Sequence, residues 1–494
     1  MRLSSLIHTS GIAGILVDGD PEIGSLVADS RKVIPGSLFV CLKGHHSDGH
    51  QFLQQAKTNG AVAAFCHSMS GFGLAKSLGL AAMVVEGSDP GLDGTSGMAG
   101  LPALCRAFFR DPSSRTRLIG ITGTNGKTTT AWLLRQALAE LGSRPAYIGT
   151  LGVQFDRDLD PLSNTTPFVV DLTQIVSDLA DAGATDVAME VSSHALAEGR
   201  ADSLTFDRAV FTNFTQDHLD FHGSMEEYAT AKLRLFRELN RGPAIINIDD
   251  PLGDKWSREL DNSITFSTVS SSKAHLTGVP THVGVDTISM EVTSQAEQVK
   301  VHSGIGGMFN VQNLLAVVST MKTMGFSLDE IAKAVSICRP VPGRFENIPN
   351  DRGIGVIVDY AHTPDALTKL LLSVRQLRPR RVITVFGCGG DRDRSKRPLM
   401  AQAAMSASDV TIITSDNPRT ENLGQIMSDI LAGVIQDKEY RVQPHRREAI
   451  LGAIEISQPG DVVVIAGKGH ENYQIIGDQK IPFDDRAIAR EGLE

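Results

Sequence analysis

The feature that most constrains the fold is a glycine-rich loop, Gly120-Ile-Thr-Gly-Thr-Asn-Gly-Lys-Thr-Thr129, between a strand-like segment and an amphipathic segment. Leu134 and Leu138 follow the loop at helical spacing. A glycine loop before a helix lets backbone N–H groups surround a polyphosphate, and the helix N-terminus adds a favourable dipole. Lys127 can then reach the outer phosphates, while the Thr128 hydroxyl can bind Mg²⁺. The usual spacing would place a glycine at position 121, where this chain has Ile, so the loop is a variant of an ATP-binding loop.

Strand-like segments alternate with helical patterns over most of the chain. In the central part they comprise residues 118–119, 186–191 and 244–248, and this alternation predicts a mostly parallel sheet. Residues 264–304 are rich in Thr, Ser and Val and predict an antiparallel excursion of the same domain. The C-terminal part predicts a doubly wound α/β domain, in which ligands bind beyond the carboxyl ends of the strands. Its strands are expected at residues 356–358, 382–386, 410–414 and 462–466.

The chain length and one segment of biased composition indicate where domains meet. A chain of 494 residues is expected to hold about three domains. Residues 86–100 are rich in Gly, Ser and Asp, which is typical of a linker. We therefore predict three α/β domains, comprising residues 1–111, 112–340 and 341–494.

The charge balance and the cysteines exclude several classes of protein. A net charge of −10 argues against a nucleic-acid binder, a nucleic-acid ATPase or a polybasic membrane-surface protein. The five cysteines are scattered without a Cys-x-x-Cys pair, which suits a reducing compartment and argues against a disulfide scaffold or a structural zinc site. The N-terminus lacks a signal-peptide pattern, and no run approaches the roughly 18 apolar residues of a membrane span. We expect a cytoplasmic protein.

Two motifs in the central part offer metal ligands. Glu190 ends a predicted strand, where a nucleotide-bound Mg²⁺ commonly finds a second protein ligand, although a helix cap would explain the same residue. His218 lies in the segment Asp217-His-Leu-Asp-Phe-His222. Because isolated histidines are often structural, the residues alone leave open whether His218 binds a metal.

Three polar segments follow strands of the C-terminal part. They are residues 387–394, 416–419 and 467–471, and each taken alone could be an ordinary turn. Because the strands are expected to be parallel, the three segments should converge at one edge of one sheet. Arginine can donate two hydrogen bonds to a carboxylate, whereas Asp, Asn and Glu accept from an ammonium group. The residues therefore predict an ATP-dependent enzyme whose second substrate resembles an amino acid.

Five motifs, in their order and spacing, resemble the Mur ligase family, the ATP-dependent amide-forming enzymes of peptidoglycan precursor synthesis. The motifs are residues 123–129, 190–194, 212–218, 310–313 and 359–364, and the resemblance spans nearly the whole chain. Residues 29–31, 35–39 and 48–50 are similar to the uridine-nucleotide domain of the members that add the third peptide residue. Asp416-Asn-Pro-Arg419 is similar to the segment by which those members take meso-diaminopimelate rather than lysine.

The resemblance implies addition of meso-diaminopimelate to the D-glutamate of UDP-N-acetylmuramoyl-L-alanyl-D-glutamate through an acyl phosphate. It implies a uridine-nucleotide-binding domain, a central P-loop ATPase domain and a Rossmann-like domain for the amino acid, with domain closure during the reaction. ATP and Mg²⁺ would be required, the enzyme would be a monomer, and Lys232 would carry a carbamate derived from carbon dioxide. Sequence alone would class Lys232 as a solvated helix lysine.

The resemblance also implies four groups of site residues. The catalytic residues are Lys127, Glu190, His218 and Lys232, of which the last three, with Thr128, are the metal ligands. ATP is bound by Gly123, Thr124, Asn125, Gly126, Lys127, Thr128, Thr129, Asn313, Arg344 and Asp359. The uridine-linked muramoyl dipeptide is bound by Ser30, His45, His46, Ser47, Asn164, Thr165, Thr166, Ser192 and Arg200. Diaminopimelate is bound by Arg392, Asp416, Asn417, Pro418, Arg419, Gly467 and Glu471.

Two alternatives stay open. A folylpolyglutamate synthase-like ligase shares the ATP loop and the acyl-phosphate route but normally lacks a separate uridine-nucleotide domain. A non-catalytic nucleotide-binding regulator could use the same scaffold, but it need not keep Lys127, Glu190, His218 and Lys232 together. One departure from the family pattern is Glu198, which adds a negative charge in the segment expected to bind an anionic dipeptide.

Overall fold

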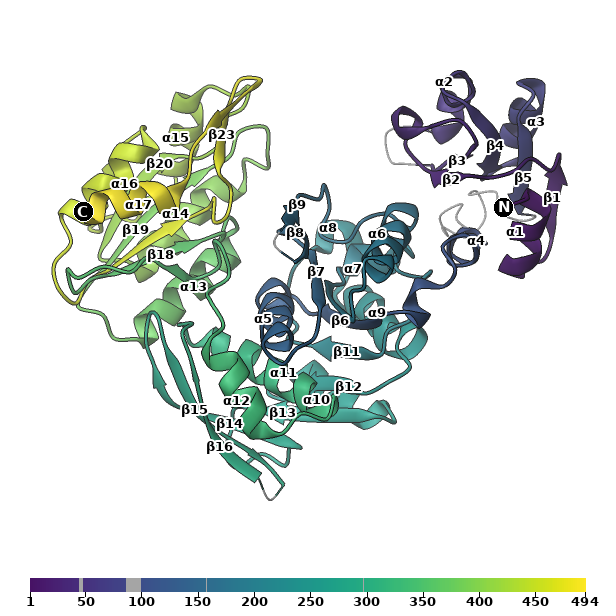
Figure 1. Cartoon of the computed structure of the whole chain (residues 1–494). Coiled ribbons are helices and arrows are strands. Elements are labelled where there is room, and N and C mark those ends of the chain that lie inside the picture. Colours follow the sequence, from purple (N-terminus) through teal and green to yellow (C-terminus); the bar gives the residue numbers. More distant parts are fainter. Residues whose placement is uncertain (44–47, 86–98, 157, 296) are drawn as a thin grey trace. The chain divides into compact units, whose positions relative to one another are not determined.

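A computed structural model describes residues 1–43, 48–85, 99–156, 158–295 and 297–494 (Figure 1). The described chain divides into two units, Met1–Thr265 and Phe266–Glu494. The predicted substrate residues His45, His46 and Ser47 lie outside the described residues. Residues 86–98 of the predicted linker lie outside them too.

The N-terminal part of the first unit, from α1 to α4, consists of helices packed on a five-stranded sheet of order β1-β5-β4-β3-β2. We call it the N-terminal layer. Strand β1 is antiparallel to β5, and the other neighbours are parallel. The strands are β1 (Ile15–Asp18), β2 (Ser25–Val27), β3 (Ser37–Val40), β4 (Ala61–Cys66) and β5 (Ala81–Val85). The helices are α1 (Leu3–Ser10), α2 (Leu53–Thr58), α3 (Met69–Ser77) and α4 (Leu101–Phe108), with short 3-10 turns η1 (Ser30–Lys32) and η2 (Gly49–Phe52).

The central sheet of the first unit confirms the predicted mostly parallel arrangement. Its order is β12-β11-β6-β10-β7-β8-β9, and all neighbours from β12 to β7 are parallel. The strands are β6 (Arg117–Thr122), β7 (Pro145–Gly149), β8 (Gly152–Phe155), β9 (Asp158–Asp160), β10 (Asp186–Glu190), β11 (Arg208–Phe211) and β12 (Ala244–Asn247). The helices are α5 (Lys127–Glu140), α6 (Val169–Asp181), α7 (Ser193–Ala197), α8 (Leu219–His222), α9 (Met225–Arg234), which continues into η4 (Leu235–Leu239), and α10 (Pro251–Glu259); η3 (Pro112–Ser114) precedes β6.

The antiparallel strands predicted for residues 264–304 are confirmed, but they fall in the second unit rather than in the unit that holds the central sheet. Strands β14 (Leu276–Val283), β15 (Ile288–Ser294) and β16 (Glu297–Ser303) form an antiparallel meander in the second unit. The meander starts beside the end of β13 (Ser263–Ser267), where Phe266 and Ser267 pair in parallel with β14. Helices α11 (Phe309–Thr323) and α12 (Leu328–Ser336) follow it.

The second unit ends in the predicted doubly wound domain, with a sheet of order β17-β18-β22-β19-β20-β21 in which only β17 is antiparallel. One hydrophobic cluster contains residues of α13, α14 and α15, and another contains residues of α16 and α17, so helices cover both faces of the sheet. The strands are β17 (Glu346–Asn347), β18 (Gly355–Asp359), β19 (Val382–Cys388), β20 (Val410–Ser415), β21 (Glu439–Val442) and β22 (Val462–Ala466), followed by the hairpin β23 (Tyr473–Ile476) and β24 (Gln479–Pro482). The helices are α13 (Pro364–Gln376), α14 (Lys396–Ala407), α15 (Leu423–Leu431), α16 (Arg446–Glu455) and α17 (Asp485–Leu493).

These sheets confirm the α/β fold class predicted from the sequence. Within the described part of the chain, no helix combines the length and the apolar character that crossing a membrane requires.

Candidate functional site

The glycine loop joins β6 to α5 and is fixed by the neighbouring strand end of β11. The backbone N–H of Thr124 donates to Asn213 O at 2.8 Å, and the N–H of Asn125 donates to Asn213 Oδ1 at 2.9 Å. Gly123 has φ +149°, and a Cβ there would lie 1.9 Å from Thr212 Oγ1, so this position requires glycine. The loop is therefore rigidly shaped, with the N-terminus of α5 directly behind it.

Two side chains of this loop adopt the geometry of a phosphate and metal site. Lys127 Nζ donates to Gly123 O and Thr124 O at 2.9 Å each, so its ammonium group lies over the loop. The Thr128 hydroxyl donates to Glu190 Oε2 at 2.9 Å. Because β10 is paired with β6, the predicted hydroxyl and carboxylate ligands meet at the carboxyl edge of the sheet.

Glu190 is buried and held by several donors. Its Oε1 accepts from Tyr147 Oη at 2.5 Å and from the N–H of Thr150 at 2.9 Å, and its Oε2 accepts from Thr150 Oγ1 at 3.2 Å. This set fixes the carboxylate rather than capping α7, whose cap is Ser192. The oxygen donors of Thr128 and Glu190 are those that Mg²⁺ prefers, so these residues fit that ion.

Lys232 is buried, in contrast to the solvated position that its sequence context favours. Its Nζ donates to Gly123 O at 2.9 Å and lies 4.5 Å from the centre of the Tyr228 ring. Burial, and then the charge of Lys127, hold the pKa of Lys232 well below its usual value. A buried amine with a lowered pKa is a nucleophile, because more of it is neutral at a given pH.

His218 stands at the start of α8 with a left-handed backbone, φ +51°. Its ring packs edge-on against His194 at 4.6 Å and its side chain is 44% exposed, so it is not a core histidine. Burial of part of the ring lowers the pKa of His218, which keeps the imidazole neutral and able to bind a metal. Among the described residues, no hydrogen bond or ion pair joins His218 to Glu190 or Lys232, although the charge of Lys232 contributes to the lowered pKa of His218.

Thr166, Ser192 and Arg200, three of the residues predicted to hold the dipeptide, meet beside the end of β10. Thr166 Oγ1 donates to Glu190 O at 2.9 Å and accepts from the N–H of Ser192 at 3.1 Å. Arg200 donates to Thr166 O at 3.1 Å and, through Nε, to Glu198 Oε2 at 2.6 Å. Glu198 therefore faces the predicted substrate arginine rather than pointing away. Of the others, Thr165 shares a hydroxyl contact with Thr150 at 3.2 Å, and Asn164 is exposed.

Three strand ends of the second unit converge as predicted. Asn417 Nδ2, after β20, donates to Glu471 Oε2 at 3.0 Å, after β22. Lys468 Nζ donates to Asn417 Oδ1 at 3.1 Å and to Glu471 Oε2 at 2.9 Å. Gly467 has φ +114°, and a Cβ there would lie 3.0 Å from Asp416 Oδ2. The predicted amino-acid residues Asp416, Asn417, Gly467 and Glu471 thus form one cluster.

The two predicted arginines lie at the edge of this cluster. Arg419 has a left-handed backbone, φ +52°, and donates to Gly390 O at 2.6 Å, which brings the loop after β20 against the loop after β19. Arg392 is exposed and donates to the neighbouring backbone, at Asp391 O. Pro418 is buried beside Arg419. The Arg419 guanidinium keeps further donors for a carboxylate.

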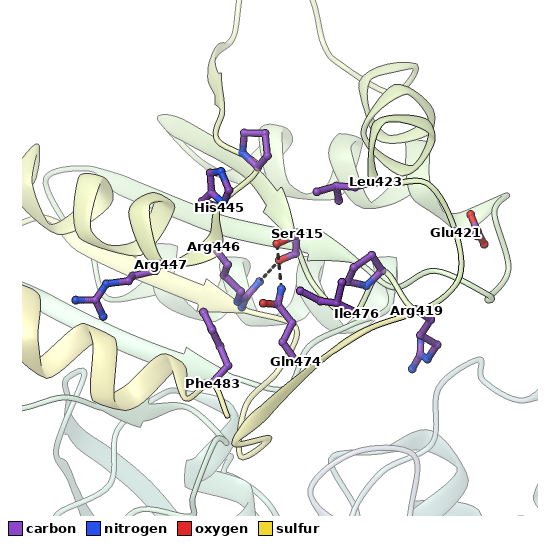
Figure 2. A pocket seen from close by; sticks show the side chains of 12 residues that line it. Ser415, Arg419, Glu421, Leu423, His445, Arg446, Arg447, Gln474, Ile476 and Phe483 are labelled. Atoms are coloured by element: carbon purple, nitrogen blue, oxygen red, sulfur yellow. Dashed lines mark hydrogen bonds between the residues drawn. The ribbon is translucent and has the colours of Figure 1, made fainter. Parts of the chain in front are cut away.

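A pocket of about 400 Å³ adjoins this cluster (Figure 2). Figure 2 shows Arg446 and Gln474 converging on Ser415, with Arg446 donating to Ser415 O at 3.2 Å and Gln474 to Ser415 Oγ at 3.1 Å. Arg446 is fully buried and pairs with Asp485 at 2.7 Å. Only Pro418 and Arg419 of the predicted amino-acid residues line this pocket.

Four further predicted residues remain, and one of them touches the amino-acid cluster, because the N–H of Gly467 donates to Asp359 O at 3.1 Å. Ser30 is buried and donates to Gln55 at 2.8 Å in the N-terminal sheet layer. In the second unit, Asn313 donates to Asn310 at 2.9 Å, and Asp359 accepts from the N–H of Phe345 at 2.7 Å. Arg344 lies over the Tyr360 ring at 4.8 Å. The ATP-binding roles of Asn313, Arg344 and Asp359 stay predictions.

Three residues that support the site belong to no familiar motif and were not predicted from the sequence. Tyr147 and Thr150 hold Glu190, and Lys468 holds Asn417 and Glu471. Lys468 was visible as the second residue of the polar segment 467–471. Tyr147 lies within β7 and Thr150 directly follows it, and the pairing of β7 with β10 brings both to Glu190.

Three family models match the chain. The Mur ligase middle domain matches residues 121–321, the Mur ligase glutamate ligase domain matches residues 343–469, and the Mur ligase family catalytic domain matches residues 22–84. These stretches contain the β6–α5 loop, the strand ends of the second unit and most of the N-terminal sheet.

The chain is also similar to individual proteins along its whole length. A UDP-N-acetylmuramoyl-L-alanyl-D-glutamate–2,6-diaminopimelate ligase of Geobacillus thermodenitrificans (strain NG80-2) is 43% identical and covers 100% of this chain and 99% of the relative. The ligase of that name from Haemophilus influenzae (strain PittGG) is 41% identical, with 96% and 97% covered. A solved structure of a UDP-N-acetylmuramoyl-L-alanyl-D-glutamate–2,6-diaminopimelate ligase superposes with a TM-score of 0.67 at 33% identity, covering 95% of this chain and 94% of that one.

Proposed function

The chain belongs to the Mur ligase family, and we propose that it uses ATP to add meso-diaminopimelate to the D-glutamate of UDP-N-acetylmuramoyl-L-alanyl-D-glutamate. The observation that carries the proposal is the 43% identity to a 2,6-diaminopimelate ligase over the full length of both chains. The N-terminal α/β layer, matched by a family model over residues 22–84, favours this reaction over that of a folylpolyglutamate synthase-like ligase. The complete set Lys127, Glu190, His218 and Lys232 favours an enzyme over a regulator.

The first step is phosphoryl transfer. An oxygen of the D-glutamyl carboxylate attacks the γ-phosphorus of ATP, the bond to the β-phosphate oxygen breaks, and ADP leaves. Both reactants are anions, so the Lys127 ammonium group over the loop offsets their repulsion and stabilises charge that develops on the transferred group. Thr128 and Glu190 would hold a Mg²⁺ ion, which supplies additional positive charge at the phosphates.

The second step forms the amide. The neutral amine of diaminopimelate attacks the acyl carbon, and the tetrahedral intermediate collapses with loss of phosphate and a proton. Asp416, Asn417 and Glu471 offer acceptors for an ammonium group of the amino acid, and Arg419 offers donors for its distal carboxylate. Lysine lacks that carboxylate and would leave Arg419 unpaired.

An isotope experiment tests the acyl phosphate. With ¹⁸O in the reacting D-glutamyl carboxylate, we expect one labelled oxygen in inorganic phosphate and the other in the amide product. Label in AMP would indicate adenylation instead, and phosphate without label would contradict the proposed first step.

We further propose that Lys232 is carbamylated. The neutral amine would attack carbon dioxide and lose a proton, which converts a buried cation into an anion beside the phosphate loop. Such an anion would help position a second Mg²⁺ with His218 and would end the repulsion between Lys232 and Lys127.

Replacing Lys232 with alanine is expected to lower kcat about 10²-fold, as loss of a group that positions a metal commonly does. A short carboxylate such as acetate should restore part of the activity, because it can occupy the space of the carbamate. The wild-type protein in ¹³C-bicarbonate should give a carbamate resonance that Lys232→Ala lacks and the exposed control Lys255→Ala keeps. Absence of this resonance from the wild-type protein would refute carbamylation.

The Glu198 carboxylate competes with the substrate for Arg200. We expect Glu198→Gln to lower the KM for the muramoyl dipeptide about threefold to tenfold, since a partly buried ion pair is worth about 1 kcal/mol. Measured KM values for ATP and for diaminopimelate should not change. A raised KM for the dipeptide would instead mean that Glu198 orients Arg200 for binding.

We propose domain boundaries at residues 111/112 and 340/341, which fall between the matched family models. We also propose that the enzyme acts in the cytoplasm as a monomer, with the N-terminal layer binding the uridine nucleotide. Sedimentation at the concentrations used for assays tests the oligomeric state.

A further inference from the structure

The N-terminal layer holds a buried cluster that the proposed reaction does not use. Cys41, Cys66 and His50 are 1%, 0% and 8% exposed. One ligand atom from each of them lies within 4.8 Å of the others. Asp48 and His67 adjoin the same imidazole.

The sheet register brings the two thiols together. Val40 pairs with Phe65 in the parallel neighbours β3 and β4, and the N–H of Cys41 donates to Phe65 O at 2.9 Å. Cys41 and Cys66 each follow a member of that pair, at the carboxyl ends of the two strands. Residues 25 positions apart in the sequence thereby become neighbours, without any Cys-x-x-Cys motif.

Asp48 orients the imidazole of His50. His50 Nδ1 lies 3.0 Å from Asp48 Oδ1, the same oxygen that lies 3.0 Å from His67 Nε2. A carboxylate at Nδ1 fixes the tautomer of a metal-binding histidine and directs the lone pair of its other nitrogen toward the ion. In the described residues His50 Nε2 is buried and has no hydrogen-bond partner.

A glycine of α3 permits the position of the His50 imidazole. A Cβ on Gly71 would lie 2.0 Å from His50 Nε2 and 2.3 Å from His50 Cδ2, so glycine at this position lets the ring pack closely against α3.

We propose that Cys41, Cys66 and His50 bind one Zn²⁺ ion, with Asp48 as the residue that positions His50. Two sulfur ligands and one nitrogen ligand select zinc over Mg²⁺, which requires oxygen ligands. The ion would tie η2 to the ends of β3 and β4 and would be separate from the phosphate loop after β6.

Cobalt spectroscopy tests the site on the full chain. We expect reduced, metal-free protein to take up one equivalent of Co²⁺ with a thiolate-to-cobalt charge-transfer band and the d–d bands of tetrahedral coordination. One equivalent of Zn²⁺ should abolish both features, whereas excess Mg²⁺ should not. The charge-transfer band is specific, because among the described residues only this cluster combines thiols with a histidine in ligand geometry.

Variants locate the ion. Cys66→Ser should lose the charge-transfer band, and Asp48→Asn should weaken Co²⁺ binding at least about tenfold. Cys338→Ser is the matched control, because its buried thiol donates to Ala334 O, as a serine hydroxyl would, away from the cluster. The proposal fails if the wild-type protein shows no thiolate band, a result that does not depend on how the variants fold. It also fails if Cys66→Ser keeps the band, or if the two thiols form a disulfide and the reduced protein takes up no Co²⁺.

Discussion

Replacing Lys127 with alanine should lower kcat for amide formation about 10³-fold or more. The Lys127 ammonium group lies over the glycine loop, 2.9 Å from both Gly123 O and Thr124 O, where the proposed reaction requires the phosphates of ATP to bind. Removal of one preorganised positive group from a phosphoryl-transfer site commonly costs about 10²- to 10⁵-fold in rate. ADP formation in the presence of all three substrates measures the effect.

The matched control for this variant is Lys255→Ala on the exposed face of α10, which should leave kcat unchanged. ATP binding to Lys127→Ala should be measured separately, because uniform loss of binding would raise KM without lowering kcat. A decrease of less than tenfold in kcat would contradict the role assigned to Lys127.

Arg419→Ala should lower kcat/KM for meso-diaminopimelate about 10²- to 10³-fold and should leave the KM for ATP unchanged. The reason is that Arg419 is the proposed partner of the distal carboxylate, and loss of one member of a desolvated charge pair costs about 2–5 kcal/mol. The variant should also discriminate less between diaminopimelate and L-lysine. Initial rates with each amino acid at saturating ATP measure both effects.

The control for this variant is Arg441→Ala on β21, whose side chain is exposed and pairs only weakly with Glu439 at 3.5 Å. Equal losses of apparent affinity for ATP and for diaminopimelate in Arg419→Ala would indicate a general structural defect and would contradict the selectivity argument.

Local sequence signals predicted the parts of the site that are themselves local. The strand, glycine loop and helix around Lys127 lie where the pattern placed them, because loop glycines and helical periodicity act over neighbouring residues. The convergence of Asp416, Asn417 and Glu471 was predictable too, since parallel strands present their carboxyl ends at one edge.

Features that depend on packing between segments far apart in the sequence were not predictable from local motifs and periodicity. Lys232 has the sequence context of a solvated helix lysine, yet α9 packs it against Gly123, over a separation of 109 residues. The scattered cysteines argued against a zinc site on spacing alone, whereas the register of β3 and β4 sets Cys41 beside Cys66. In both cases the decisive information is which strands and helices become neighbours.

The most direct test of the proposed ligase reaction measures phosphate release from ATP in the presence of the uridine-linked muramoyl dipeptide. Either meso-diaminopimelate or L-lysine is added, in parallel assays. We expect phosphate release with diaminopimelate, formation of the matching amide product, and little release with lysine. If lysine is used as well as diaminopimelate, the result agrees with a ligase reaction but refutes the selectivity assigned to Arg419. Failure to release phosphate with either amino acid, in protein that binds ATP, would contradict the proposed reaction.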